Sequence, residues 1–312
     1  MPDGSPVPNR EAESYVRLVR IATWNVNSLM ARLEVVEAWL QRAEPDVLLL
    51  QETKLSDAKV PDLSFRMAGY EIAHHGEGRW NGVAIASRSP ITDVVTNFGE
   101  GPVGPDASDA GGGDYAPLRQ ARMIGGVSDG IRFISVYAPN GRKIGTSFYQ
   151  GKLDWLDRLH RWLEESCEPG DPLVLGGDLN VTPTDDDVWD ARAAHGGTHV
   201  SAEEREALAK LRKWGLTDAY RLKEPAPDRY TWWDYRAGMF QKNMGMRLDL
   251  IYVTQPLVDR VVWSEIDREA RKGKPTPSDH APVVVDIDEP GRPLDAGWHA
   301  ALERIASRSR SG

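Results

Sequence analysis

Two segments of the chain repeat one strand–helix–strand pattern, and this repeat restricts the possible folds more than any other feature of the sequence. In the first segment, the strand VRIATWNVN leads into a helical spacing of leucine and valine, and the apolar strand DVLLL follows. In the second segment, IRFISVYAPN leads into a helix over residues 149–163, and the strand PLVL follows. Apolar strands joined in this way are typical of α/β proteins, in which helices cover the sheets.

Each of these strands ends in a polar side chain that a buried strand does not require. The first repeat supplies Asn25 and Glu52, and the second supplies Tyr137, Asp178 and Asn180. Residues i and i+2 of an extended chain point to the same side, roughly 7 Å apart, so Asp178 and Asn180 are expected side by side. Because α/β proteins assemble their sites at strand ends, two packed sheets related by the repeat would bring all these residues to one edge.

Length and composition fit one large domain or two ordinary ones. The chain has 312 residues, of which 40% are hydrophobic, and this content can supply a sizeable core. We interpret residues 1–17 and 289–312 as polar tails on a single domain at 18–288. Residues 1–17 carry no signal-peptide pattern, and no later segment approaches the roughly 18 apolar residues of a membrane span. We expect a cytoplasmic protein, and a monomer.

The lone cysteine, Cys167, limits the kinds of metal site that the chain can form. It excludes an internal disulfide and every multi-cysteine zinc site, so a bound metal must use oxygen or histidine ligands. Glu52 follows the apolar run VLLL at the carboxyl end of its strand, and Asn25 lies at the corresponding end of the preceding strand. We therefore interpret Glu52 as the ligand of a hard cation. Mg²⁺ takes one or two carboxylates plus water and phosphate oxygens. The residue types predict Mg²⁺, with Mn²⁺ as a substitute.

The segment MRLDLIYV places Asp249 inside an apolar strand. A buried carboxylate is costly unless it is paired, and His280 in PSDHAP is the expected partner. An aspartate bound to one imidazole nitrogen fixes the tautomer and leaves the other nitrogen to contact a phosphate or a proton. The neighbouring Asp279 would point toward a cation. The alternative for PSDHAP is an ordinary turn before a strand.

The net charge of -9 argues against a nucleic-acid partner, but the distribution of charge matters more than the sum. Residues 141–152, 235–247 and 271–274 carry positive charge and no acidic residue. Taken singly, each stretch is more simply a solvated loop; if they flank the acidic strand ends, they form a phosphate-binding surface. Their basic residues are Arg142, Lys143 and Lys152; Arg236, Lys242 and Arg247; and Arg271, Lys272 and Lys274.

Other motifs have simpler structural interpretations. GVSDG at 126–130 fits the G-x-S-x-G pattern of hydrolases, but it lies between two strands, where Ser-Asp-Gly predicts a hairpin turn. TDDDVWD could be a cation cluster, but after a proline it predicts a short helix capped by Thr184 or Asp185. His74 and His75 are assigned no role.

Three further segments carry local signals. A capping box that opens at Ser201 predicts a helix over 202–214. The Gly- and Pro-rich stretch from Gly99 to Leu118 has the composition of a mobile loop, which we expect to join the two repeats. Of Trp232 and Trp233, one is expected in the core, and an exposed one would stack on a sugar or base.

The motifs TWNVNS, LQETK, VYAPNG, GGDLN, TWWDYR, MRLDL and PSDHAP, in this order, resemble the exonuclease III family of Mg²⁺-dependent DNA-repair nucleases, which includes the abasic-site endonucleases. The resemblance runs from about Arg20 to Ile287. It implies a four-layer α/β sandwich, in which two packed mixed β-sheets lie between helices and are related by a pseudo-two-fold repeat. The domain at 18–288 would then be the catalytic domain.

The resemblance also implies a role for each matching residue. Glu52 would be the main Mg²⁺ ligand, and Asp178 would act as acid or base while Asn180 orients the phosphate. Tyr137 would contact the phosphate, and His280, paired with Asp249, would stabilise its developing charge. The implied metal-site residues are Glu52, Asn25, Asp279, Asp178 and Asn180.

The expected DNA-binding residues combine the basic stretches with the family's pocket positions. They are Asn140, Arg142, Lys143, Trp232, Arg236, Met246, Leu248 and Lys272. Among them, Trp232, Met246 and Leu248 match positions that line the pocket for an extruded abasic sugar. Two positions depart from the pattern. Asn27 stands where some members have Asp, which removes a second acid from the metal site, and Met246 stands where some have Trp, which affects the selectivity of the pocket.

The sequence therefore predicts Mg²⁺-dependent hydrolysis of phosphodiester bonds in duplex DNA that contains abasic sites or 3′ ends. The expected activities are 3′–5′ exonuclease action, removal of 3′ blocking groups and cleavage 5′ to abasic sites. A phosphatase or phosphodiesterase of the same fold, acting on inositol phosphates or phospholipids, is the alternative enzyme, although it has no use for the basic stretches. A non-catalytic DNA-binding scaffold is disfavoured because no ligand position is lost.

Overall fold

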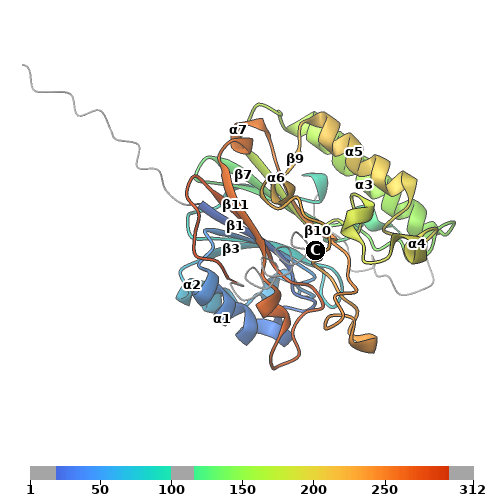
Figure 1. Ribbon diagram of the computed structural model, residues 1–312. Helices are drawn as coiled ribbons and strands as arrows, with labels where there is room; N and C mark the ends of the chain where they lie inside the picture. Colours follow the sequence, from blue (N-terminus) through green and yellow to red (C-terminus); the bar gives the residue numbers. More distant parts are fainter. Residues whose placement is uncertain (1–18, 100–115, 295–312) are drawn as a thin grey trace, which may run out of the picture.

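Two six-stranded β-sheets pack face to face in the computed structural model, which describes residues 19–99 and 116–294 (Figure 1). The strands are β1 (Val19–Asn25), β2 (Val47–Gln51), β3 (Glu71–His75), β4 (Val83–Ser87), β5 (Thr92–Thr96), β6 (Met123–Ser128), β7 (Ile131–Tyr137), β8 (Leu173–Asp178), β9 (Thr217–Asp218), β10 (Asp249–Val253), β11 (Val261–Ile266) and β12 (Val283–Ile287). The α-helices are α1 (Leu33–Ala43), α2 (Asp62–Met67), α3 (Ser147–Ser166), α4 (Ala191–Ala194), α5 (Ala202–Trp214), α6 (Ala219–Lys223) and α7 (Gln255–Val258).

The two sheets have the same strand plan. Their orders are β11-β12-β1-β2-β4-β3 and β5-β6-β7-β8-β10-β9. In each sheet the central pair, β1–β2 or β7–β8, is parallel, and every other pair of neighbours is antiparallel. Strand by strand, the two orders correspond, so the predicted four-layer α/β sandwich with an internal repeat is confirmed.

Helices cover the outer face of each sheet because their apolar residues lie on one side. Helix α1 connects β1 to β2 and buries Val36, Trp39, Leu40 and Ala43, a spacing that places them on one face. Helix α3 makes the equivalent connection from β7 to β8 and packs with α5 over the second sheet. Figure 1 shows α1 and α2 on one side of the strands and α3 and α5 on the opposite side. An apolar cluster with residues from both sheets fills the space between them.

The stretch from Gly99 to Leu118 does not join the two repeats, so that prediction is wrong. Strand β5 precedes this stretch and β6 follows it, and the two are neighbours in the second sheet. The chain instead passes from the first sheet to the second between β4 and β5. Composition indicates a loop but carries no information about which strands the loop connects. Residues 100–115 lie outside the described residues.

Several local predictions are confirmed. Asp129 and Gly130 adopt positive φ angles of 47° and 75° in the hairpin between β6 and β7, as a tight turn requires. Thr184 caps a 3₁₀ helix at Asp185–Asp187. Helix α5 begins after the capping box of Ser201 and ends before Gly215. His74 and His75 lie on β3, which forms a hairpin with β4.

The two predicted tails lie mostly outside the described residues. Residues 289–294 are described, and they bind to the first sheet through Gly291, whose amide donates to Asp286 Oδ2 at 2.6 Å, and Leu294, whose amide donates to Glu265 Oε2 at 2.9 Å. Residues 1–17 and 295–312 are not described. Within 19–99 and 116–294, no helix has the length and apolar character that crossing a membrane would require.

Candidate active site

The carboxyl ends of both parallel strand pairs meet at one edge of the molecule, as predicted. Asn25 ends β1, Glu52 follows β2, and Asp178 ends β8. The buried Asn25 side-chain amide donates to Glu52 Oε1 at 2.8 Å and to Asp178 Oδ2 at 2.9 Å. One amide therefore connects the end of the first sheet with the end of the second.

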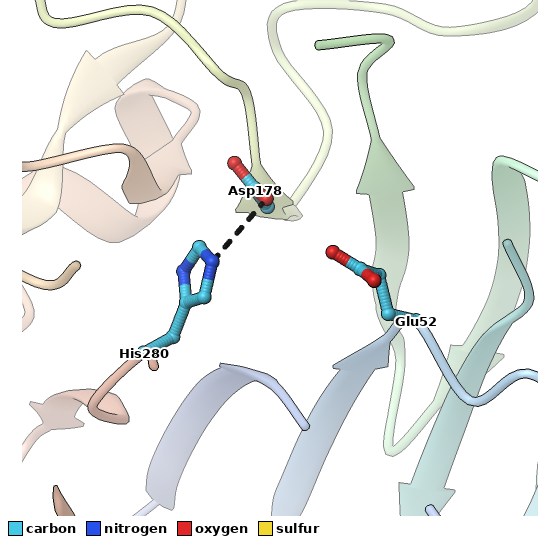
Figure 2. A group of neighbouring side chains, drawn as sticks. All are labelled: Glu52, Asp178 and His280. Atoms are coloured by element: carbon cyan, nitrogen blue, oxygen red, sulfur yellow. Dashed lines mark ion pairs between the residues drawn. The ribbon is translucent and has the colours of Figure 1, made fainter. Parts of the chain in front are cut away.

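Glu52, Asp178 and His280 form a three-residue group in which one ligand atom from each lies within 4.8 Å of the other two. Figure 2 shows their side chains pointing toward a common space, with Glu52 and Asp178 at strand ends. His280 Nε2 lies 3.9 Å from Asp178 Oδ2, and Figure 2 marks this ion pair. Two carboxylates and an imidazole in this arrangement can hold a cation and move a proton.

Asp249 and His280 are paired as the sequence predicts. His280 Nδ1 donates to the buried Asp249 Oδ2 at 2.7 Å. Burial alone would lower the pKa of His280, but the carboxylates of Asp249 and Asp178 outweigh it and raise this pKa to about 10. At neutral pH the ring is therefore an imidazolium that directs positive charge into the site.

Asp178 has an unusual proton affinity for a carboxylate. Burial raises its pKa to about 7, and the charges of Asp249 and Glu52 act in the same direction, while His280 opposes them. Asp178 Oδ1 accepts a hydrogen bond from the Asn180 backbone amide at 2.9 Å. A carboxylate that titrates near neutral pH is suited to general acid–base catalysis.

The backbone at these strand ends adopts conformations that L-residues rarely use. Glu52, Lys54 and Asn180 have φ angles of 51°, 54° and 52°. Left-handed φ angles at non-glycine residues are uncommon and concentrate at functional sites. Gly177 has a related constraint, because a Cβ atom there would lie 1.9 Å from the Val136 carbonyl oxygen of β7. The glycine before Asp178 thus allows β7 and β8 to approach closely.

The donor set fits an oxygen-binding cation. The Lys54 ammonium lies 2.8 Å from Glu52 Oε2 and donates to Asn27 Oδ1 at 2.6 Å, so a positive group already stands beside the Glu52 carboxylate. Glu52, Asp178 and the side-chain amide oxygens nearby are ligands that Mg²⁺ uses. Lys54 is part of the LQETK motif, but the motif alone predicts no role for it.

Asp279 lies beside the three-residue group rather than in it. Its carboxylate accepts hydrogen bonds from Asn27 Nδ2 at 2.9 Å and from Trp232 Nε1 at 3.0 Å. Burial would raise the pKa of Asp279, but His280 and these donors hold it below its usual value. Asp279 is thus a carboxylate at neutral pH. The neutral Asn27 side chain donates a hydrogen bond to it, whereas an aspartate at position 27 would repel it.

Hydrogen-bond donors gather on the other side of Asp178. Asn180 Nδ2 donates to the Ala138 carbonyl at 2.9 Å, and Asn140 Nδ2 donates to Asn180 Oδ1 at 3.4 Å. Burial, together with the Glu52 carboxylate, raises the pKa of Tyr137 well above its usual value, so its hydroxyl keeps its proton. Neutral amide and hydroxyl donors of this kind can bind phosphate oxygens.

Two of the expected pocket residues, Trp232 and Met246, are paired through their backbones. Trp232 forms isolated antiparallel β-bridges with Met246 and with His280. Trp233 is buried, which confirms that one of the two tryptophans belongs to the core, and Trp232 is half-buried. Leu248 has only 3% of its surface exposed, so it offers little surface to a ligand.

Three of the predicted basic residues are internal, so the expectation that they bind phosphate is wrong. Lys152, Arg247 and Arg271 have 0%, 1% and 7% of their surface exposed. Lys152 pairs with Glu204 at 2.5 Å, and Arg247 pairs with Asp187 at 2.7 Å. A linear pattern cannot reveal that a cation has a partner far along the chain. The remaining basic residues of these stretches are exposed: Arg142, Lys143, Arg236, Lys242, Lys272 and Lys274.

Comparisons with known proteins agree with this geometry. The sequence profile of the Endonuclease/Exonuclease/phosphatase family matches residues 22–280. Exodeoxyribonuclease III from Haemophilus influenzae is 30% identical over 284 residues, which cover 86% of this chain and 100% of that protein. An AP endonuclease structure from Archaeoglobus fulgidus has a TM-score of 0.78 and 35% identity, covering 87% of this chain and 100% of that chain. The structure of a 3′ phosphatase from Neisseria bound to a product DNA hairpin has a TM-score of 0.77 and 35% identity, with the same coverage of 87% and 100%.

Proposed function

The chain belongs to the Endonuclease/Exonuclease/phosphatase family, and we propose that it is a metal-dependent DNA-repair nuclease that hydrolyses phosphodiester bonds of duplex DNA. The observation that carries this proposal is the convergence of Glu52, Asp178 and His280 within 4.8 Å at one edge of the sandwich. The names of the relatives support it, since they include an exodeoxyribonuclease III and an AP endonuclease.

The proposed metal is Mg²⁺. Glu52 would be its main ligand, with Asn25, Asp178, Asn180 and Asp279 around it. When bound, Mg²⁺ neutralises negative charge that develops on the phosphate and on the leaving oxygen. The carboxylates of Glu52, Asp178 and Asp279 support this assignment, because Mg²⁺ prefers oxygen ligands, and the Lys54 ammonium shows that a cation is stabilised beside Glu52.

The proposed chemistry divides the work among the protein groups. Asp178, with a pKa of about 7, accepts a proton from the attacking water or returns one to the leaving oxygen. The His280 imidazolium stabilises the charge that develops on the phosphate, and Asp249 keeps that ring protonated. Asn180 and Tyr137 donate hydrogen bonds to the non-bridging oxygens.

The proposed substrate is duplex DNA with abasic sites or 3′ ends. Exposed cations such as Arg142, Lys143 and Lys272 would contact the phosphate backbone without reading sequence. Trp232 and Met246 would line the pocket for an extruded abasic nucleotide, which lacks base pairing and is therefore the least costly nucleotide to flip. We further propose that residues 18–288 form the catalytic domain and that the protein acts as a monomer in the cytoplasm.

Two substrates test the proposal directly. A duplex with a central abasic analogue and a duplex with a recessed 3′ end are each incubated with Mg²⁺ or with EDTA, beside inositol phosphate and sphingomyelin. We expect cleavage of both duplexes with Mg²⁺ and none with EDTA. Hydrolysis of the inositol phosphate or sphingomyelin without DNA cleavage would instead identify a phosphatase or phosphodiesterase of the same fold.

A variant pair tests the role of Asp178. Asp178→Asn should lower kcat by about 100- to 10,000-fold, the usual contribution of general acid–base catalysis, while DNA affinity is retained. The matched control is Asp171→Asn, which changes an exposed acid just before the same strand and should leave kcat unchanged. Equal losses of DNA binding and turnover in Asp178→Asn would mean that Asp178 is structural.

A further inference from the structure

We propose that the buried Lys152 is a positioning residue, which fixes the backbone of Asn140 and Asn180 and thereby the phosphate side of the site. This inference rests on the proposed function, which assigns Asn180 to phosphate binding, and on the expected contact of Asn140 with DNA. Lys152 lies on α3, behind the two loops that follow β7 and β8. It has no exposed surface, so it cannot contact DNA itself.

The Lys152 ammonium uses all of its donors on groups that belong to the site or support it. It donates to the Asn180 carbonyl at 2.6 Å and to the Asn140 carbonyl at 3.3 Å. It also pairs with Glu204 Oε1 at 2.5 Å. Because an ammonium has three donors, one side chain joins both loops to helix α5.

Glu204 is itself held in place by the segment before α5. Its Oε1 accepts from Thr198 Oγ1 at 2.8 Å and from the His199 backbone amide at 3.0 Å, and its Oε2 accepts from Ser201 Oγ at 2.7 Å. His199 Nδ1 donates to the same Asn180 carbonyl at 2.5 Å. The Glu204 carboxylate therefore has a fixed orientation, and its contact with Lys152 fixes the position of the ammonium.

Displacement of the Asn180 backbone would move several site atoms together. Asn180 has a left-handed φ of 52°, a conformation that its surroundings must maintain. Its backbone amide donates a hydrogen bond to Asp178 Oδ1 at 2.9 Å, and its side-chain Oδ1 accepts one from Asn140 Nδ2 at 3.4 Å. The first loop also packs closely on the lysine stem, because a Cβ atom on Gly141 would lie 2.9 Å from Lys152 Cδ.

A purely structural ion pair is the competing explanation, and the chain contains a matched control for it. Arg20 and Asp286 form another buried pair at 2.8 Å, with 5% and 0% of the side chains exposed. Like Lys152, Arg20 also donates to two backbone carbonyls, those of Ala43 and Arg292. Arg20 lies near the start of β1, whereas Asn25 ends that strand, so about 16 Å separates this pair from the site.

The experiment compares the two pairs after both charges of each have been removed. Lys152→Met with Glu204→Gln avoids an unpaired buried charge and should lower kcat on the abasic duplex by about 10- to 100-fold, because displacements near 1 Å can cost this much. KM and DNA affinity should stay within about twofold. Arg20→Met with Asp286→Asn should lower the melting temperature to a similar extent while kcat stays within about twofold.

Other outcomes would overturn the inference. It fails if the Lys152/Glu204 variant keeps its kcat, or if both pair variants lose kcat equally. If that variant does not fold, Thr198→Val provides a milder test, since it removes one bond to Glu204 and one of 3.2 Å to the Asn140 carbonyl. A kcat unchanged in Thr198→Val would then count against positioning.

Hydrogen exchange separates this inference from the proposed function. Amide exchange is measured without DNA in the wild-type protein and in the Lys152/Glu204 variant. Faster exchange confined to residues 138–141 and 178–181 supports positioning even if the wild-type protein cuts no DNA, in which case only the proposed function fails. Unchanged exchange in these loops would overturn the positioning role.

Discussion

Replacing Asp187 with asparagine should destabilise the protein, because it removes the charge that balances a buried arginine. Arg247 Nε donates to Asp187 Oδ1 at 2.7 Å, and Arg247 Nη1 lies 2.8 Å from Asp218 Oδ2. Asp187 also accepts from Arg221 at 2.5 Å and closes the capping box of Thr184. The network thus connects the loop after β8 to the residue beside Met246.

The size of the effect follows from what remains after the change. Breaking a buried ion pair costs about 3–5 kcal/mol because a charge is left without compensation. Asp218 still faces Arg247, and asparagine can still accept the capping bonds, so we expect a value at the lower end, about 3 kcal/mol. At about 2 °C per kcal/mol for a domain of this size, the melting temperature should fall by about 6 °C.

The control is the pair between Arg260 and Asp288, which lie 2.8 Å apart with 41% and 21% of their side chains exposed. Asp288→Asn should cost about 0–1 kcal/mol, since solvent screens an exposed pair, and should lower the melting temperature by less than about 2 °C. Thermal melts followed by circular dichroism measure both variants. Equal shifts for Asp187→Asn and Asp288→Asn would refute the argument from burial.

The pH dependence provides a second check on the source of this stability. Burial would raise the pKa of Asp187, but Arg247 and Arg221 outweigh it and hold this pKa below 3.8. A group whose pKa is depressed by folding stabilises the native state above its unfolded pKa and loses that contribution as pH falls through the folded pKa. The difference in melting temperature between wild type and Asp187→Asn should therefore be constant above about pH 5 and shrink below about pH 4. A difference that persists unchanged at pH 3 would show that the Asp187 charge is not its source.

Three other predictions follow from the site. Gly177→Ala places a Cβ 1.9 Å from a backbone carbonyl oxygen of β7 and should abolish soluble expression. Gly170→Ala, which has open space around it, should be expressed and melt like wild type. Equal soluble yield and equal melting temperature of the two variants would refute the packing argument. Combined Arg142→Ala and Lys143→Ala should reduce the slope of log affinity against log salt concentration by about 2 in a binding titration, and an unchanged slope would exclude them as phosphate contacts. Glu52→Gln should raise the Mg²⁺ concentration for half-maximal cleavage by more than about tenfold without changing the melting temperature in EDTA, and an unchanged Mg²⁺ requirement would exclude Glu52 as a ligand.

Most of the architecture could be predicted from the sequence because its signals are local. Strand and helix periodicity, the turn residues Asp129 and Gly130 and the capping box of Ser201 each act within a few residues. The convergence of Asn25, Glu52 and Asp178 was also predictable, since the repeat places parallel strands with their carboxyl ends at one edge. These signals do not depend on knowing which distant segments touch.

The buried charge networks could not be predicted because their partners lie far apart along the chain. Lys152 and Glu204 are separated by 52 residues, and Arg247 and Asp187 by 60. The sequence around Lys152 therefore resembles an exposed basic loop, and Glu204 resembles a helix cap with no other role. The connection made by residues 99–118 was misjudged for a similar reason, because loop composition does not specify which sheet the neighbouring strands enter.

Strand β12 is synthesised late but lies in the interior of the first sheet, between β11 and β1. His280 lies shortly before this strand in the chain, whereas Glu52 and Asp178 emerge from the ribosome much earlier. A nascent chain that has not yet reached His280 and β12 contains both carboxylates but lacks the imidazolium beside them, and β1 has no partner on one side. The site is thus completed only after His280 and β12 have been synthesised, so nascent chains that end before them do not carry the assembled site.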